Sequence, residues 1–276
     1  MDMGIQKKVS ILGCGWLGFP LAKRLLRDGF HVNGSTTSLI KVEELKNAGI
    51  KAYQLDYQPN KKSHPHDFFN ADILFLNIPF SRQLKDPRVY LQQIEAVIKD
   101  IRGGTINFVI FASSTAVYDE SVTEAREETP LVLKTDRQQV LHQVEERLRQ
   151  ERGFETTVLR FGGLVGPDRP IGKFMAGKKD APGPQQRVNL IHLDDCLEIV
   201  TQIIKKDIRG EILNAVCDEH PTRENIYTTA ARRLNLPPPQ FLADQKSTSF
   251  KIVSNKRLKE RFGYSFIHPD PMGFIE

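Results

Sequence analysis

The sequence predicts a doubly wound α/β fold, in which a parallel β-sheet carries helices on both of its faces. Short runs rich in apolar and β-branched residues alternate with longer amphipathic segments along most of the 276 residues. The run Ile73–Ile78 is apolar at nearly every position, which is typical of an inner parallel strand that is buried on both faces. Alternation of this kind predicts strands joined by crossover helices.

The elements follow one another in a regular order. Strands are expected at Val9–Leu12, His31–Ser35, Lys51–Asp56, Ile73–Ile78, Asn107–Ser113, Thr156–Phe161, Val188–His192 and Ile212–Val216. Helices are expected at Gly18–Arg27, Ser38–Asn47, Arg88–Ile101, Thr135–Gln150 and Asp195–Lys205. Each helical segment repeats apolar residues at the spacing of one buried face, whereas the strand segments are short and β-branched.

The composition excludes several classes of protein. The net charge is +5, but 39 Lys and Arg residues are spread among 34 Asp and Glu residues, and no aromatic-basic interleaving predicts a nucleic-acid partner. Three distant cysteines, Cys14, Cys196 and Cys217, show no spacing for a disulfide framework or a zinc site, so no metal is expected. No apolar stretch approaches the roughly 20 residues of a membrane span. These features predict a cytoplasmic protein with no membrane partner.

A glycine loop joins the first predicted strand to the first helix. The segment Gly13-Cys14-Gly15-Trp16-Leu17-Gly18 has the GxGxxG spacing in the strand-loop-helix context that dinucleotide binding needs. Gly13 permits a tight turn, Gly15 lets the backbone approach a pyrophosphate, and Gly18 lets the helix lie close to the strand. The helix N-terminus offers amide groups and a positive dipole to phosphates. We therefore expect a Rossmann fold that binds a dinucleotide.

The end of the second strand indicates which dinucleotide. NAD is usually held there by a carboxylate that accepts hydrogen bonds from the ribose, and this chain has none. Ser35, Thr36 and Thr37 supply hydroxyl groups instead, and Lys41 lies one turn into the next helix. This pattern suits a 2′-phosphate and favours NADP over NAD, although Ser38 also fits a simple helix cap.

Two stretches interrupt the alternation of strands and helices. Residues 166–186 are rich in Gly, Pro and Lys, and the tail 217–276 contains one capped helix after Thr222. We expect residues 1–165 to form the NAD(P)-binding domain, to which residues 187–216 return. Residues 166–186 and 217–276 would form a smaller C-terminal substrate lobe.

Several motifs together resemble the extended short-chain dehydrogenase/reductase family, the NAD(P)-dependent epimerases and dehydratases. The motifs are the glycine loop, Asp56, Asn77-Ile78-Pro79, Ser113-Ser114-Thr115-Ala116-Val117-Tyr118, Leu159-Arg160 through Val165-Gly166-Pro167, and Asn189 through Asp195. The resemblance covers nearly the whole chain. It implies that Asp56 lies at the adenine, that Asn77, Ile78 and Pro79 line the ribose and phosphate side, and that Ser114 and Thr115 orient a substrate oxygen.

The chain departs from this family in two places. Leu12 replaces the earlier glycine of the family's GxxGxxG loop, so Gly13 is expected to make the turn. More importantly, Arg137 and Leu141 occupy the places of the catalytic tyrosine and of the lysine four residues later. Arginine has no acceptor lone pair and stays protonated, so it cannot act as the acid/base. This places the chain in an atypical branch that lacks the catalytic pair.

Other residues are candidates for the missing roles. Tyr118 or His192 could move a proton, although Tyr118 also fits a packing role and His192 a helix start. Lys173, Arg160 and Arg187 are candidates to bind an anionic substrate, and each also fits an ordinary surface or ion-pair role.

Two functions remain open. The first is an oxidoreductase or isomerase acting on a carbonyl or hydroxyl of a small, anionic or sugar-like substrate. The second is a non-catalytic module that senses NADP. The helices Arg88–Ile101 and Thr135–Gln150 resemble the pair that forms dimer interfaces in the family, which is compatible with a homodimer but leaves the oligomeric state open.

Overall fold

The computed structural model describes residues 7–59, 66–242 and 250–275. Its centre is a seven-stranded sheet in the order β10-β7-β5-β4-β1-β2-β3. The strands are β1 (Lys8–Leu12), β2 (His31–Thr36), β3 (Lys51–Gln54), β4 (Ile73–Leu76), β5 (Phe108–Ser114), β7 (Glu155–Phe161) and β10 (Ile212–Ala215). The pairs β1–β2, β1–β4, β2–β3 and β4–β5 are parallel, and the residues of β4 are all buried. The doubly wound Rossmann fold is therefore confirmed.

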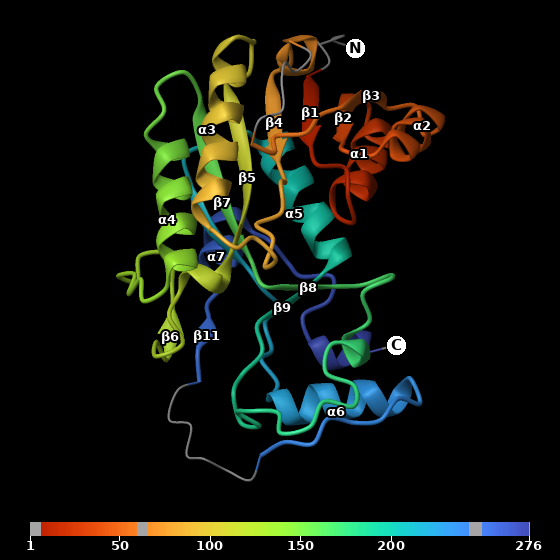
Figure 1. The fold of residues 1–276 in the computed structure, drawn as a ribbon, viewed down its shortest axis with the longest axis vertical. Coiled ribbons are helices and arrows are strands. Elements are labelled where there is room, and N and C mark those ends of the chain that lie inside the picture. The colour runs from red at the N-terminus through yellow and green to blue at the C-terminus, as the bar shows by residue number, and fades with distance from the viewer. Residues whose placement is uncertain (1–6, 60–65, 243–249, 276) are drawn as a thin grey trace. The chain divides into compact units, whose positions relative to one another are not determined.

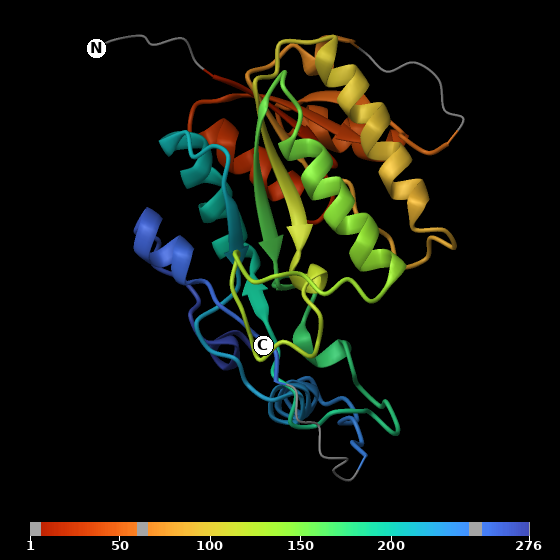
Figure 2. The same cartoon turned by 90° about the vertical axis from the view of Figure 1, so that its left-hand side faces the viewer.

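The helices cover both faces of this sheet because the strand order reverses at β1. The helices are α1 (Gly18–Arg27), α2 (Leu39–Asn47), α3 (Arg88–Arg102), α4 (Asp136–Arg149) and α5 (Leu193–Lys206). Right-handed crossovers that run from β1 toward β3 and from β4 toward β7 place their helices on opposite faces. Accordingly, α3 and α4 lie side by side on one face and α1 on the other (Figure 1, Figure 2).

The chain divides into two compact units. The first comprises residues 1–113, 135–159 and 200–212, and the second comprises residues 114–134, 160–199 and 213–276. The second unit is larger than the predicted lobe because it also takes 114–134, 160–165, 187–199 and 213–216 from the predicted nucleotide domain. The predicted strand Val188–His192 explains part of this difference. It forms β9 (Leu190–His192), which pairs with β8 (Gly163–Val165) in a separate two-stranded sheet.

The second unit has its own short elements and its own core. It contains β6 (Glu124–Ala125) paired with β11 (Ile252–Val253), together with α6 (Arg223–Arg233) and α7 (Lys256–Phe262). Short 3-10 turns in the chain are η1 (His66–Phe69), η2 (Thr115–Val117), η3 (Ile171–Lys173) and η4 (Pro271–Phe274). The predicted cap of α6 is confirmed, because the Thr222 hydroxyl accepts from the Asn225 amide. The apolar core of the second unit contains Val165, Ile171, Leu190, Ile226, Ala230 and Ile275.

Candidate cofactor and substrate site

The glycine loop lies where the strand order reverses, between the carboxyl ends of β1 and β4. Gly13 has a φ of 109°, and a Cβ there would lie 2.5 Å from the Asn77 carbonyl oxygen. A Cβ on Gly18 would lie 2.2 Å from the Gly13 carbonyl oxygen. Both positions therefore exclude a side chain, and the strand, the loop and α1 can approach each other closely.

Gly15 differs from its two neighbours in the motif. It is exposed, and a Cβ added there would meet nothing within 4 Å. The adjoining N-terminus of α1 has no side-chain cap, since its N-cap residue is Leu17, and no acidic residue lies in its first turn. Open space beside uncapped amide groups suits a pyrophosphate, so this loop fits a dinucleotide.

The remaining loop residues contribute mainly to packing. Cys14 and Leu17 are buried, whereas Trp16 is partly exposed. Burial raises the pKa of the Cys14 thiol to about 12, so this cysteine is an inert apolar group. The prediction that Cys14 and Leu17 contact a cofactor is therefore limited to their backbone atoms.

At the end of β2, two residues that were predicted to bind a phosphate, Ser35 and Thr36, have buried side chains. Ser35 is 1% exposed, its hydroxyl accepts from the Gly13 amide at 3.1 Å, and its carbonyl accepts from the Cys14 amide at 2.7 Å. Its side chain holds the glycine loop and does not face a ligand. The Thr36 side chain is also buried and accepts from the Ser38 amide. Ser38 makes no side-chain cap.

Two predicted residues of this site stay on the surface. Thr37 and Lys41 are both exposed, Thr37 directly after β2 and Lys41 in the first turn of α2. They belong to the first compact unit, as does the whole glycine loop. They are therefore the predicted residues of this site whose side chains reach the surface of this unit.

The remaining predicted cofactor residues follow β3 and β4. The Asn77 side-chain amide donates to the Gly13 carbonyl at 3.0 Å, which ties the end of β4 to the glycine loop. The Tyr90 hydroxyl donates to the Ile78 carbonyl, and Pro79 is exposed. Asp56 is partly buried and accepts from the Gln58 amide. Contacts of these residues with adenine or ribose stay predictions.

The two α4 residues that were predicted to stand at the places of the catalytic pair make structural contacts. The Arg137 guanidinium donates to the carbonyls of Phe80 and Ser81 at 2.9 and 3.0 Å and lies 4.0 Å from the Phe80 ring centroid. Leu141 is buried, as its apolar spacing predicts. Arg137 thus holds the segment after β4, a role that the sequence did not reveal.

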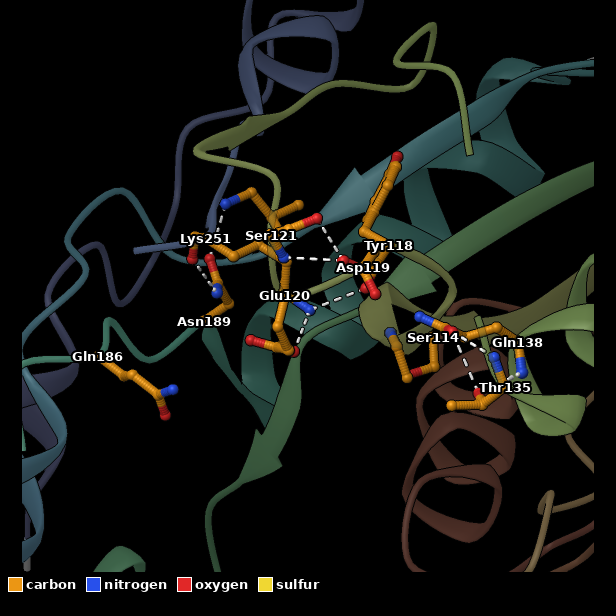
Figure 3. A network of polar contacts seen from close by, with 12 residues as sticks. Ser114, Tyr118, Asp119, Glu120, Ser121, Thr135, Gln138, Gln186, Asn189 and Lys251 are labelled. Atoms are coloured by element: carbon orange, nitrogen blue, oxygen red, sulfur yellow. Dashed lines mark hydrogen bonds and ion pairs between the residues drawn. The ribbon is translucent and has the colours of Figure 1, made fainter. Parts of the chain in front are cut away.

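Ser114 ends β5 and turns the chain into η2. The Ser114 hydroxyl oxygen accepts from the Ala116 amide at 3.1 Å (Ser114 is labelled in Figure 3). Thr115, the next residue, is buried. A hydroxyl has one proton and two lone pairs, so this bond leaves the Ser114 proton for donation.

Tyr118 is not placed to exchange a proton with a substrate. It is 1% exposed, its hydroxyl donates to Asn214 at 2.9 Å, and it accepts from Arg160 at 2.8 Å. Burial raises the pKa of the phenol, while the Arg160 guanidinium opposes that shift. Arg160 is 2% exposed, so the structure also argues against its predicted role in binding an anionic substrate. The Arg160 guanidinium is instead engaged inside the protein, where it donates to the Tyr118 hydroxyl.

Lys251 joins this region and was not found from the sequence. Its ammonium group donates to the Tyr118 carbonyl at 3.0 Å and pairs with Glu120, while the Asn189 side chain bonds the backbone of the same segment (Figure 3). Lys251 and Tyr118 are 133 residues apart, so no local pattern links them.

Three other predicted site residues, His192, Lys173 and Arg187, belong to the second unit. The His192 ring is buried and accepts from the Asp194 amide at 3.2 Å, which confirms the alternative that it shapes the start of α5. Lys173 is exposed at the end of η3. Arg187 is exposed and donates to the His220 carbonyl at 3.0 Å.

The sheet order and the glycine loop at its reversal define a Rossmann-type α/β protein. No family model matches the chain. The chain is 36% identical to Protein YeeZ of Escherichia coli K12 in an alignment of 270 residues. This alignment covers 97% of this chain and 98% of Protein YeeZ. The chain therefore belongs to the same protein family as Protein YeeZ. No helix among the described residues is long and apolar enough to cross a membrane.

Solved structures support the fold over the full length. A conserved protein of unknown function from Silicibacter pomeroyi superposes with a TM-score of 0.76 at 21% identity, over 98% of this chain and 97% of that one. A protein assigned as an NAD-dependent epimerase/dehydratase from Methylobacillus flagellatus gives 0.76 at 23%, over 98% and 96%. A short-chain dehydrogenase/reductase superfamily protein from Agrobacterium tumefaciens with bound NAD gives 0.73 at 16%, over 97% and 94%.

Proposed function

We propose that this protein is an NADP(H)-binding oxidoreductase or epimerase of the extended short-chain dehydrogenase/reductase type. The observation that carries the proposal is the open backbone at Gly15, beside the uncapped N-terminus of α1 and between the close contacts of Gly13 and Gly18. A pyrophosphate is bound by this combination of open space and the amide groups of a helix N-terminus. The fold neighbour with bound NAD is consistent with it.

The preference for NADP is assigned to Thr37 and Lys41. Both are exposed at the end of β2 and the start of α2, and no carboxylate there would repel a 2′-phosphate. Because Lys41 is exposed, its contribution is modest, on the order of 1 kcal/mol or less, which corresponds to about a fivefold change in the dissociation constant.

A nicotinamide dinucleotide, when bound, supplies or accepts a hydride. The Ser114 hydroxyl would donate a hydrogen bond to a carbonyl or alcohol oxygen of the substrate and so orient it. Arg137 cannot exchange a proton at working pH, and the Tyr118 hydroxyl is bonded in the interior. Another group or a water molecule would therefore carry the proton. Lys173 and Arg187 are the exposed cations proposed for an anionic part of the substrate.

A second candidate function is a non-catalytic module that senses NADP. The observation that favours it is that Arg137 and Leu141, at the places of the family's acid/base pair, are committed to structural contacts. The glycine loop would then be kept for binding alone.

Titration of the purified protein with NADPH and with NADH, followed by nicotinamide fluorescence, tests the proposal. We expect tighter binding of NADPH, weakened by Lys41→Ala and abolished by Gly15→Val. Gly153→Val is the matched control, because Gly153 also has open space around an added Cβ. Absence of binding to either cofactor would contradict both functions.

A second experiment separates the two functions. NADPH oxidation is measured against a panel of small carbonyl compounds and sugar nucleotides, with Ser114→Ala in parallel. Turnover that Ser114→Ala reduces while NADPH affinity is unchanged supports the enzyme. NADPH binding without turnover of any compound favours the sensing module.

A further inference from the structure

Two histidines and an aspartate converge in the second unit. The His268 Nε2 lies 2.9 Å from the Asp194 Oδ2, and the His192 Nδ1 lies 3.3 Å from the same oxygen. One potential ligand atom from each of the three residues lies within 4.8 Å of the other two. The imidazole rings are 4.0 Å apart, and the Phe274 ring lies 5.2 Å from one and 5.7 Å from the other.

The backbone around these side chains is held firmly. Asp195 is fully buried, and its carboxylate accepts from the amides of Ile267 and His268 and from the Tyr264 hydroxyl. His268 is therefore positioned by hydrogen bonds that do not involve its own ring. A side chain whose backbone is already fixed in this way binds an ion or molecule at a smaller entropic cost than a mobile side chain.

The hydrogen bonds place two electron pairs next to each other. A neutral imidazole nitrogen that accepts from the Asp194 amide carries no proton of its own. In that tautomer two electron-pair donors, the His192 Nδ1 and the Asp194 Oδ2, lie 3.3 Å apart and repel each other. A cation between them would remove this repulsion, and a metal ion would take the Nδ1 lone pair in place of the weak amide bond.

The donor set and the spacing both suit a transition metal. Imidazole and carboxylate are ligands of Zn²⁺ and related divalent ions. Tetrahedral ligands about 2.0–2.1 Å from Zn²⁺ are about 3.3 Å from one another, close to the two separations observed. Asp194 is 53% exposed, so water can reach a fourth position.

We propose that His192, Asp194 and His268 form a binding site for a divalent transition-metal ion, with three protein ligands and a fourth position for water. The site joins the end of β9 and the first turn of α5 to the C-terminal segment. The ion would link this segment to β9 and α5 within the second unit, and the site is independent of the cofactor proposal.

Zn²⁺ titration of the chelator-treated, full-length protein by calorimetry tests this site. We expect one Zn²⁺ per chain, and a visible absorption band of four-coordinate Co²⁺ when Co²⁺ is the probe. His268→Gln and Asp194→Asn should each weaken Zn²⁺ binding by more than about 100-fold, since even outer partners of metal ligands are worth about 10- to 100-fold.

The control is His31→Gln, which removes an exposed histidine on β2 of the first unit. It should bind Zn²⁺ as the unmodified protein does. Circular dichroism in the presence of chelator verifies that each variant is folded, and two separate ligand variants are available should one unfold. Failure of the unmodified protein to bind one equivalent, or unchanged binding in both ligand variants, overturns the proposal.

Discussion

Alanine at Gly18 should lower the stability of the protein, whereas alanine at Gly15 should leave stability unchanged and weaken cofactor binding. A Cβ on Gly18 would lie 2.2 Å from the backbone oxygen of Gly13 and 3.1 Å from a side-chain carbon of Ile11. Because the nearest atom is backbone, it cannot move aside without shifting the loop. A Cβ on Gly15 meets nothing within 4 Å, so the fold accepts it.

The expected magnitudes follow from these contacts. Overpacking typically costs about 1–3 kcal/mol, and a clash with backbone lies at the upper end of that range. The better helix propensity of alanine offsets up to about 1 kcal/mol. Gly18→Ala should therefore lower the free energy of unfolding by about 2 kcal/mol, or the Tm by roughly 4–8 °C. Gly15→Ala should leave stability within about 0.5 kcal/mol and weaken NADPH binding by about tenfold or more.

Urea denaturation followed by circular dichroism measures the first effect, and NADPH fluorescence titration measures the second. If Gly18→Ala is as stable as the unmodified protein, the argument from close packing of α1 on the loop is refuted. If Gly15→Ala binds NADPH with unchanged affinity, the open space at Gly15 does not receive the cofactor.

Three further outcomes are expected in the first unit. Arg137→Ala should lower the free energy of unfolding, measured in urea, by about 1–3 kcal/mol. Arg137→Lys should restore less than half of the lost free energy, because lysine lacks the planar guanidinium with its several donors. Full restoration by lysine would refute the role of the guanidinium. Arg102 and Arg147 lower the pKa of Glu151 to about 2. Because the folded-state pKa lies below the ordinary value of 4.5, the ionised Glu151 carboxylate stabilises the fold fully above pH 4.5, and this contribution is lost as the pH falls toward 2. Glu151→Gln should therefore flatten the acid limb of the curve of unfolding free energy against pH. An unchanged acid limb would contradict this. Thr135→Ala removes a capping box from α4 and should cost about 1 kcal/mol, measured by thermal unfolding, whereas Thr135→Ser should cost little.

Local patterns in the sequence were sufficient for most of the first unit. Strands such as β4 and helices such as α4 were expected within one or two residues of their observed ends, because hydrophobic periodicity and capping act over a few residues. The glycine spacing likewise located the turn between β1 and α1. The placing of Arg137 and Leu141 at the positions of the tyrosine and lysine rests on an alignment of short motifs alone and stays a prediction.

Tertiary structure decided which side chains face a ligand and which face the interior. Ser35 was expected at a phosphate and instead holds the glycine loop, and Tyr118 and Arg160 satisfy each other inside the second unit. His268 meets Asp194 across 74 residues of sequence. Such contacts depend on how distant segments are brought together by packing of the whole chain, and no periodicity or spacing along the sequence encodes them. The sequence by itself thus determined the sheet, its crossover helices and the glycine loop, and the three-dimensional packing determined the chemistry around them.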